Sequence, residues 1–377
     1  MKKWGALVLA ALLALGACSA YAEHTDEEVQ KMAEEELKLC REVAFYPHAF
    51  EGDFQQFYVD FHTLSRQLRS SGFTAEDYDK VAELTRKREA LTQIVDDPKS
   101  TVWKIWGENM ASEPKPTEGW EVSYDNEDFV PNLCPYLIED QEHVKGNVIV
   151  IGGGGSTHRN NVVEGYPVAE FFNENGYNAF VLQRRVQPYA NEDSILDMAR
   201  AVRYIRHYAD EKGIGNPEVV IGCGFSAGGM NILGAMAMQY GHVTPDAIYP
   251  DYVCDEVDQE SADLSVALPI YGCVDMGYDM SVNPNLPPIF TVVGQQDPLF
   301  KDAVGQTLTW LMSLDTDVCY IVAPDAGHGF GLGTGTPNYV NAFSMAQEWP
   351  ELALKFLDTR LGYEEKVVEV NAVALPT

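Results

Sequence analysis

The chain is poor in positive charge. Its 377 residues include 26 lysines and arginines against 57 aspartates and glutamates, which gives a formal net charge of −31. Such a surface repels phosphate groups, so the composition argues against a nucleic-acid partner. Cys-x-x-Cys and His-x-x-x-His patterns are both absent, so the sequence gives no indication of a metal site.

Long apolar runs are also absent beyond the first residues. Residues 7–15 form a short apolar run behind Lys2 and Lys3, which predicts a secretory signal peptide over residues 1–22 rather than a membrane-spanning helix. Two cleavage sites compete. Residues 15–18 resemble a bacterial lipobox that would place a lipid on Cys18, whereas Ala-Tyr-Ala at residues 20–22 suits ordinary signal peptidase. We expect an exported protein, either secreted or anchored to a membrane through Cys18, and favour the lipobox.

Cysteine is scarce, with seven residues in all. Without Cys18 an even number remains, and an exported chain permits disulfides. Cys254 and Cys273 flank one segment and are the first pair to expect. Cys223 lies beside a glycine-rich turn and is expected to be a buried thiol.

The arrangement of helical and strand patterns predicts two regions before a short tail. Residues 23–115 carry apolar stripes at helical spacing, and a Pro-Lys-Pro sequence at residues 114–116 marks their end. Helices packed on a neighbouring core are expected there, with a lid or carbohydrate platform as the alternative. Residues 116–362 alternate strands with helices, and residues 363–377 form the tail. The sequence therefore predicts an α/β fold with a mostly parallel sheet and helices on both faces.

The most informative motif is Gly-x-Ser-x-Gly at residues 224–228. It connects a β-branched run at 218–221 to a helical run at 230–238, which is the context of a nucleophile elbow. Side chains at Gly224 and Gly228 would collide with the neighbouring strand and helix. The turn would expose the Ser226 hydroxyl and direct the Ala227 N–H toward a developing oxyanion. The alternative is a glycine-rich turn that only packs.

A glycine-rich loop supplies the second half of such a site. The apolar strand 147–151 leads into four consecutive glycines, and Gly154 and Gly155 are the candidate oxyanion donors. A phosphate cradle is the competing interpretation, but no Gly-Lys-Ser/Thr sequence follows.

An acid and a base follow two later strands. Asp297 comes after strand 288–293, and His328 comes after strand 319–322 with a glycine on each side. Asp275 and Asp279 are alternatives for the acid. The order Ser226, Asp297, His328 is that of a hydrolase triad. Histidine titrates near neutrality and can take the serine proton, and a carboxylate can hold the imidazole in the required tautomer.

Residues from about 120 to 362 resemble the α/β-hydrolase superfamily, and among its members the bacterial carbohydrate acetyl esterases, which include acetyl xylan esterase-like proteins. The resemblance is carried by residues 151–155, 164–169, 176–186, 197–206, 224–229 and 327–330. Where that family often has proline before its glycines and an aromatic residue after them, this chain has Gly152 and Ser156.

The resemblance implies a serine esterase that removes small acyl groups, above all acetyl, from small-molecule or carbohydrate esters without a cofactor. It also carries the nucleophile, acid and base over to Ser226, Asp297 and His328. A lipase- or peptidase-like hydrolase is the alternative within enzymes, and a non-catalytic surface protein on the same fold is the alternative outside them. Finally, Glu164 and Arg185 are expected to form an ion pair that braces the loop carrying Gly154 and Gly155, with an ordinary surface ion pair as the alternative.

Overall fold

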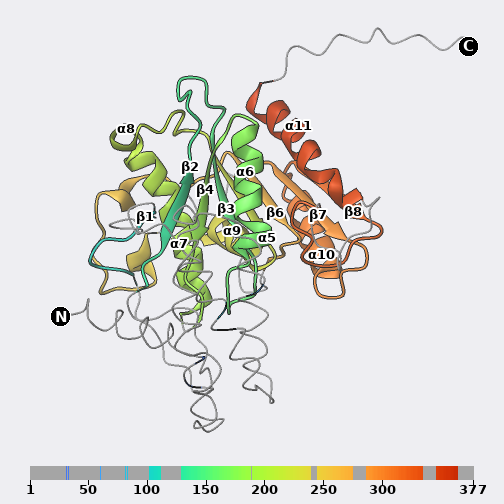
Figure 1. Cartoon of the computed structure of the whole chain (residues 1–377), viewed down its shortest axis with the longest axis horizontal. Helices are drawn as coiled ribbons and strands as arrows, with labels where there is room; N and C mark the ends of the chain where they lie inside the picture. The colour runs from blue at the N-terminus through green and yellow to red at the C-terminus, as the bar shows by residue number, and fades with distance from the viewer. Residues whose placement is uncertain are drawn as a thin grey trace, which may run out of the picture. The chain divides into compact units, whose positions relative to one another are not determined.

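A computed structural model of the chain shows its architecture (Figure 1). The structure describes residues 102–111, 129–187, 189–238, 244–274, 286–333 and 345–363, together with Lys31, Ala33, Asp60, Val81 and Glu83. The chain divides into two compact units, Met1–Thr101 and Val102–Thr377. The five described residues of the first unit are all helical. The predicted signal peptide, Cys18 and the tail beyond Tyr363 lie outside the described residues.

The second unit is built around one eight-stranded sheet with the strand order β1-β2-β4-β3-β5-β6-β7-β8. The strands are β1 (Trp103–Lys104), β2 (Asn132–Tyr136), β3 (Asn147–Ile151), β4 (Asn178–Gln183), β5 (Val220–Phe225), β6 (Val266–Ile270), β7 (Ile289–Gly294) and β8 (Val318–Ala323). The pairs β1–β2 and β2–β4 are antiparallel, and every other pair is parallel.

Helices connect these strands. They are α5 (Asn161–Glu164), α6 (Tyr166–Glu174), α7 (Asn191–His207), α8 (Ala209–Lys212), α9 (Ala227–Met238), α10 (Lys301–Ser313) and α11 (Trp349–Leu361), with short 3-10 helices at Pro245–Ala247, Val257–Gln259 and Met345–Gln347. α6 contacts β3 and β4, α9 contacts β5 and β6, and α11 contacts β6 and β7. Figure 1 shows α6 and α11 on the viewer's side of the sheet.

Strand β5 shows why both faces of the sheet need helices. All of its residues are buried, and successive side chains point to opposite faces. A Cβ atom on Gly222 would lie 3.1 Å from Met198 Cε of α7 and 3.3 Å from Ile232 Cδ1 of α9. Phe225, on the other face, packs its ring edge-on against Trp349 of α11. The predicted α/β class, with a mostly parallel sheet covered on both faces, is confirmed.

The sheet begins earlier in the chain than the Pro-Lys-Pro sequence suggests. Trp103 pairs with Leu133 and Lys104 with Asn132 in the antiparallel ladder, and the Trp103 ring lies 5.8 Å from that of Phe180. The second compact unit accordingly starts at Val102, within the region expected to be helical up to residue 115. A two-residue edge strand is too short to give the alternating pattern by which strands are found in a sequence.

The cysteine prediction is wrong in one respect. Cys254 and Cys273 do not form the expected disulfide with one another. Cys273 is buried behind the end of β6, whereas Cys254 is partly exposed and donates to Asp246 Oδ1. Cys223 is buried in β5 as expected, and burial raises the pKa of its thiol.

Candidate active site

Ser226 stands at a sharp turn between the last residue of β5 and the first residue of α9. Its φ of +50° lies in the left-handed region that L side chains rarely adopt. A Cβ atom on Gly224 would lie 2.4 Å from the carbonyl oxygen of Gly228, and one on Gly228 would lie 2.2 Å from that of Ile151. Both positions therefore require glycine for the steric reason inferred from the sequence.

Three side chains from different strand ends meet at this turn. Nε2 of His328 lies 2.9 Å from Oγ of Ser226, and Nδ1 of His328 lies 2.7 Å from Oδ2 of Asp297. The Asp297 side chain is fully buried, and that of His328 is 21% exposed. A serine within hydrogen-bond reach of a base, with the base oriented by a carboxylate, is the geometry of an activated nucleophile. Asp275 and Asp279 lie outside the described residues.

The Asp297 carboxylate is held as an anion. Burial opposes its ionisation, but hydrogen bonds from His328 and from the N–H groups of Leu299 and Phe300 prevail, and the pKa of Asp297 lies below its ordinary value. Because the pKa of Asp297 is lower in the folded state, its carboxylate stabilises the fold at pH values above the pKa that the carboxyl has in the unfolded chain. This contribution is lost as the pH falls through the lower, folded-state value. Asp297 is thus charged at neutral pH.

Aromatic rings fix the plane of the His328 imidazole. Phe300 stacks on it with ring centroids 4.9 Å apart, and Tyr271 presents its ring at 5.0 Å and 62°. Tyr271 directly follows β6 and adopts a φ of +38°, so a fourth strand end contributes to the site. No motif identifies Tyr271 or Phe300 in the sequence. Their only signal is their position just after the carboxyl end of a parallel strand or close to it.

The glycine loop passes next to the serine. A Cβ atom on Gly153 would lie 2.9 Å from Cβ of Ser226. The Gly153 N–H donates to Oε2 of Glu164 at 2.8 Å, so it is not available to a substrate. The N–H groups of Gly154 and Ala227, by contrast, have no acceptor within the described part of the chain. These two amides are therefore available to an oxyanion on the serine side of the loop.

The expected ion pair between Glu164 and Arg185 is wrong. Arg185 donates instead to Asp197 of α7, with Nη2 2.7 Å from Oδ1 and Nε 3.0 Å from Oδ2. Glu164 accepts from Tyr271 and from Gly153. Both side chains are buried, but Arg185, which follows β4, contacts α7, whereas Glu164, the last residue of α5, contacts the glycine loop. The arginine that contacts this loop is Arg184, whose Nη2 donates to Gly155 O at 2.9 Å.

The described ranges contain no group of three or more His, Cys, Asp and Glu side chains arranged to hold a metal ion. Within the same ranges, no helix combines the length and apolarity needed to cross a bilayer.

Comparison with known proteins relates this geometry to solved structures. No family model matches the sequence, and no curated protein matches it. The acetyl ester-xyloside bifunctional hydrolase of Caldicellulosiruptor lactoaceticus superposes with a TM-score of 0.54 at 23% identity, over 70% of this chain and 97% of that protein. A carboxylesterase of Lactobacillus plantarum gives 0.52 at 17% identity, over 64% and 96%. The chain has the α/β-hydrolase fold.

A third solved α/β-hydrolase structure is also similar to this chain in fold. The thermophilic esterase of Thermogutta terrifontis with bound propionate gives a TM-score of 0.50 at 20% identity, over 64% of this chain and 93% of that one. On this fold, the structure brings Ser226, Asp297 and His328 together and places Gly153 of the glycine loop next to Ser226. Sequence reasoning missed the connection between Glu164 and Tyr271 that lies behind the loop.

Proposed function

We propose that this α/β-hydrolase is a serine esterase that removes small acyl groups, acetyl above all, from carbohydrate esters. The observation that carries the proposal is the continuous contact from Ser226 through His328 to a buried, ionised Asp297. The fold supports it, and the solved structures named above are ester hydrolases.

The first half-reaction follows from these contacts. Oγ of Ser226 attacks the ester carbonyl carbon while Nε2 of His328 takes the hydroxyl proton. Asp297 holds the proton on Nδ1 and stabilises the imidazolium. The N–H groups of Ala227 and of Gly154, with Gly155 beside it, are the proposed donors to the tetrahedral oxyanion. The imidazolium then protonates the departing sugar oxygen, which leaves as a free hydroxyl, and the acyl group stays on Ser226.

The second half-reaction repeats these steps with water. His328 takes a proton from a water molecule, the resulting nucleophile attacks the acyl carbon, and the imidazolium returns the proton to Oγ of Ser226. The products are a carboxylic acid and the free enzyme. These steps need no group beyond the chain's own residues and water.

The acyl group can be tested by varying its length. Ser226 is only 7% exposed, and the resemblance to acetyl esterases implies a small acyl pocket. We expect kcat/KM for p-nitrophenyl acetate to exceed that for the octanoate by about 10-fold or more. A pocket that is too small for several methylene groups binds the transition state of the longer ester less tightly, by a few kcal/mol. Faster cleavage of the octanoate would favour a lipase-like enzyme. Acetylated xylo-oligosaccharides, with acetate release measured directly, test the carbohydrate part.

Export and anchoring are part of the same proposal. The short apolar run at residues 7–15 and the lipobox-like residues 15–18 support a lipid on Cys18. We expect the protein expressed in bacteria to incorporate radiolabelled palmitate and to lose the label on Cys18→Ser substitution. Equal labelling of both forms would contradict lipid attachment at Cys18. A wild-type protein that is released without label would favour cleavage after Ala22.

A further inference from the structure

A buried carboxyl group connects the glycine loop to the loop that carries His328. Glu164, the last residue of α5, is 2% exposed. Its Oε2 accepts from the N–H of Gly153 at 2.8 Å, and its Oε1 accepts from the hydroxyl of Tyr271 at 2.7 Å. The Tyr271 hydroxyl oxygen in turn accepts from the N–H of Gly331 at 3.1 Å. One carboxyl thus fixes a backbone amide next to Ser226 and, through a phenol, a backbone amide three residues after His328.

The end of this connection nearest His328 is itself held in place. The carbonyl of Gly331 accepts from the indole of Trp349 at 3.0 Å. The Tyr271 ring packs against His328 and against Phe330, with centroids 5.0 and 4.7 Å away. Movement of Glu164 would therefore displace both the glycine loop and the imidazole of His328.

The hydrogen-bond pattern fits a charged Glu164. The groups that contact its carboxyl are donors: the Gly153 amide, the Tyr271 phenol and the Asn160 side chain. A protonated carboxyl would be a weaker acceptor for the Tyr271 hydroxyl and would need an acceptor for its own hydrogen. Burial raises the pKa of Glu164 above its ordinary value, while these hydrogen bonds and the nearby His328 act in the opposite direction. Burial of Tyr271 and its contact with the Glu164 carboxyl raise the pKa of the Tyr271 hydroxyl.

We propose that Glu164 is a positioning residue of the esterase. It holds the glycine loop through Gly153, and it acts on His328 through Tyr271 and through its own negative charge. The inference rests on the proposed function. When Ser226 attacks, His328 becomes cationic, so a buried anion next to it favours the transition state over the ground state. Fixing Gly153 also keeps the following amide, that of Gly154, directed at the oxyanion.

Glu164→Gln tests this directly, because it keeps the shape of the side chain and removes the charge. We expect kcat for p-nitrophenyl acetate to fall about 10- to 100-fold, less than or comparable to the loss of one oxyanion donor, with KM within about twofold because the ground state is little affected. Glu170→Gln is the matched control. It makes the same chemical change on α6, where Glu170 is exposed, and should leave kcat unchanged.

A transition-state analogue separates positioning from simple stability. A trifluoromethyl ketone forms a hemiketal with Ser226, and its inhibition constant should rise with Glu164→Gln by about the factor by which kcat/KM falls. If Glu164 only stabilised the fold, its substitution would lower the thermal midpoint, but the inhibition constant would not rise in proportion to the fall in kcat/KM. Tyr271→Phe keeps the ring and removes the hydroxyl, and should lower kcat about 3- to 10-fold, in keeping with one lost hydrogen bond.

Wild-type kcat in Glu164→Gln would overturn the inference. If that variant does not fold, wild-type kcat in Tyr271→Phe would overturn it instead. Failure of the proposed function looks different, because then the wild-type protein would lack esterase activity or Ser226→Ala would retain it.

Discussion

Ser226→Ala should lower kcat for p-nitrophenyl acetate by about 10³-fold or more, because it leaves only binding and oxyanion stabilisation to accelerate the reaction. Oγ of Ser226, just after the end of β5, lies 2.9 Å from Nε2 of His328. Its loss removes the nucleophile without altering the steric requirement for Gly224 and Gly228 that shapes the turn. Steady-state hydrolysis with purified protein, with the thermal midpoint as a check on folding, measures the effect.

Two companion variants test whether the three side chains act as a unit. His328→Ala should match Ser226→Ala within about a factor of ten, since losses within a catalytic triad do not add. Asp297→Asn should also lower kcat severely, by up to about 10⁴-fold, because an amide favours the wrong imidazole tautomer. A wild-type rate in Ser226→Ala, or a nearly silent Asp297→Asn, would contradict the assignment.

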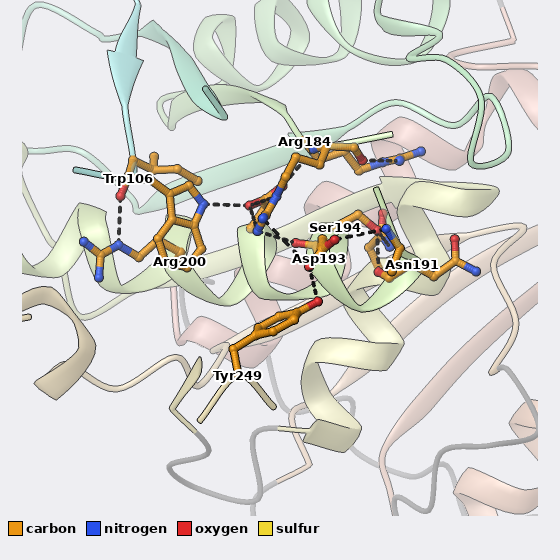
Figure 2. A network of polar contacts seen from close by, with 12 residues as sticks. Trp106, Arg184, Asn191, Asp193, Ser194, Arg200 and Tyr249 are labelled. Atoms are coloured by element: carbon orange, nitrogen blue, oxygen red, sulfur yellow. Dashed lines mark hydrogen bonds and ion pairs between the residues drawn. The ribbon is translucent and has the colours of Figure 1, made fainter. Parts of the chain in front are cut away.

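Arg185→Ala should lower the free energy of unfolding by about 3–5 kcal/mol, because it leaves a buried carboxylate without its cation. The side chains of Arg185 and Asp197 are both fully buried and 2.7 Å apart. The indole of Trp106 donates to the same carboxylate at 2.7 Å. Figure 2 shows Trp106, Asp193 and Tyr249 in one network of polar contacts, in which the Tyr249 hydroxyl donates to Asp193. Urea denaturation gives the free energy of unfolding.

A matched surface pair provides the control. Lys301 lies 3.8 Å from Asp302, and both side chains are exposed, so Lys301→Ala should cost only about 0–1 kcal/mol. A double variant, Arg185→Met with Asp197→Leu, should be less destabilised than Arg185→Ala, since it removes the stranded charge together with its partner. A cost below about 1 kcal/mol for Arg185→Ala would show that Asp197 finds another cation or water.

The elbow and the alternation of strands with helices could be predicted because each depends on local sequence. Gly224 and Gly228 are required by contacts with backbone atoms only a few residues away or on the adjacent strand. Asp297 and His328 follow strands whose β-branched runs are plain in the sequence, and parallel strands bring their carboxyl ends to one edge. The meeting of the three side chains then follows from topology.

The partners of buried charges could not be predicted in the same way. Arg185 lies within reach of both Asp193 and Asp197, and opposite charge alone did not exclude Glu164. Only the direction of α7 against β4 decides the pairing. Tyr271 was missed because its role depends on a backbone φ of +38° and on a carboxyl 107 residues away. The expected disulfide between Cys254 and Cys273 is wrong for the same reason, since spacing in the sequence does not give the separation of two thiols in the fold.

The most direct test of the central claim is to identify the residue that a fluorophosphonate modifies. The probe reacts with a serine only when a base has activated it. We expect peptide mass spectrometry of the treated wild-type protein to find one adduct, on Ser226, and to find labelling at least about 10²-fold slower in His328→Ala, in line with the contribution of a general base. An adduct on another serine, or equal labelling rates in wild type and His328→Ala, would contradict the account.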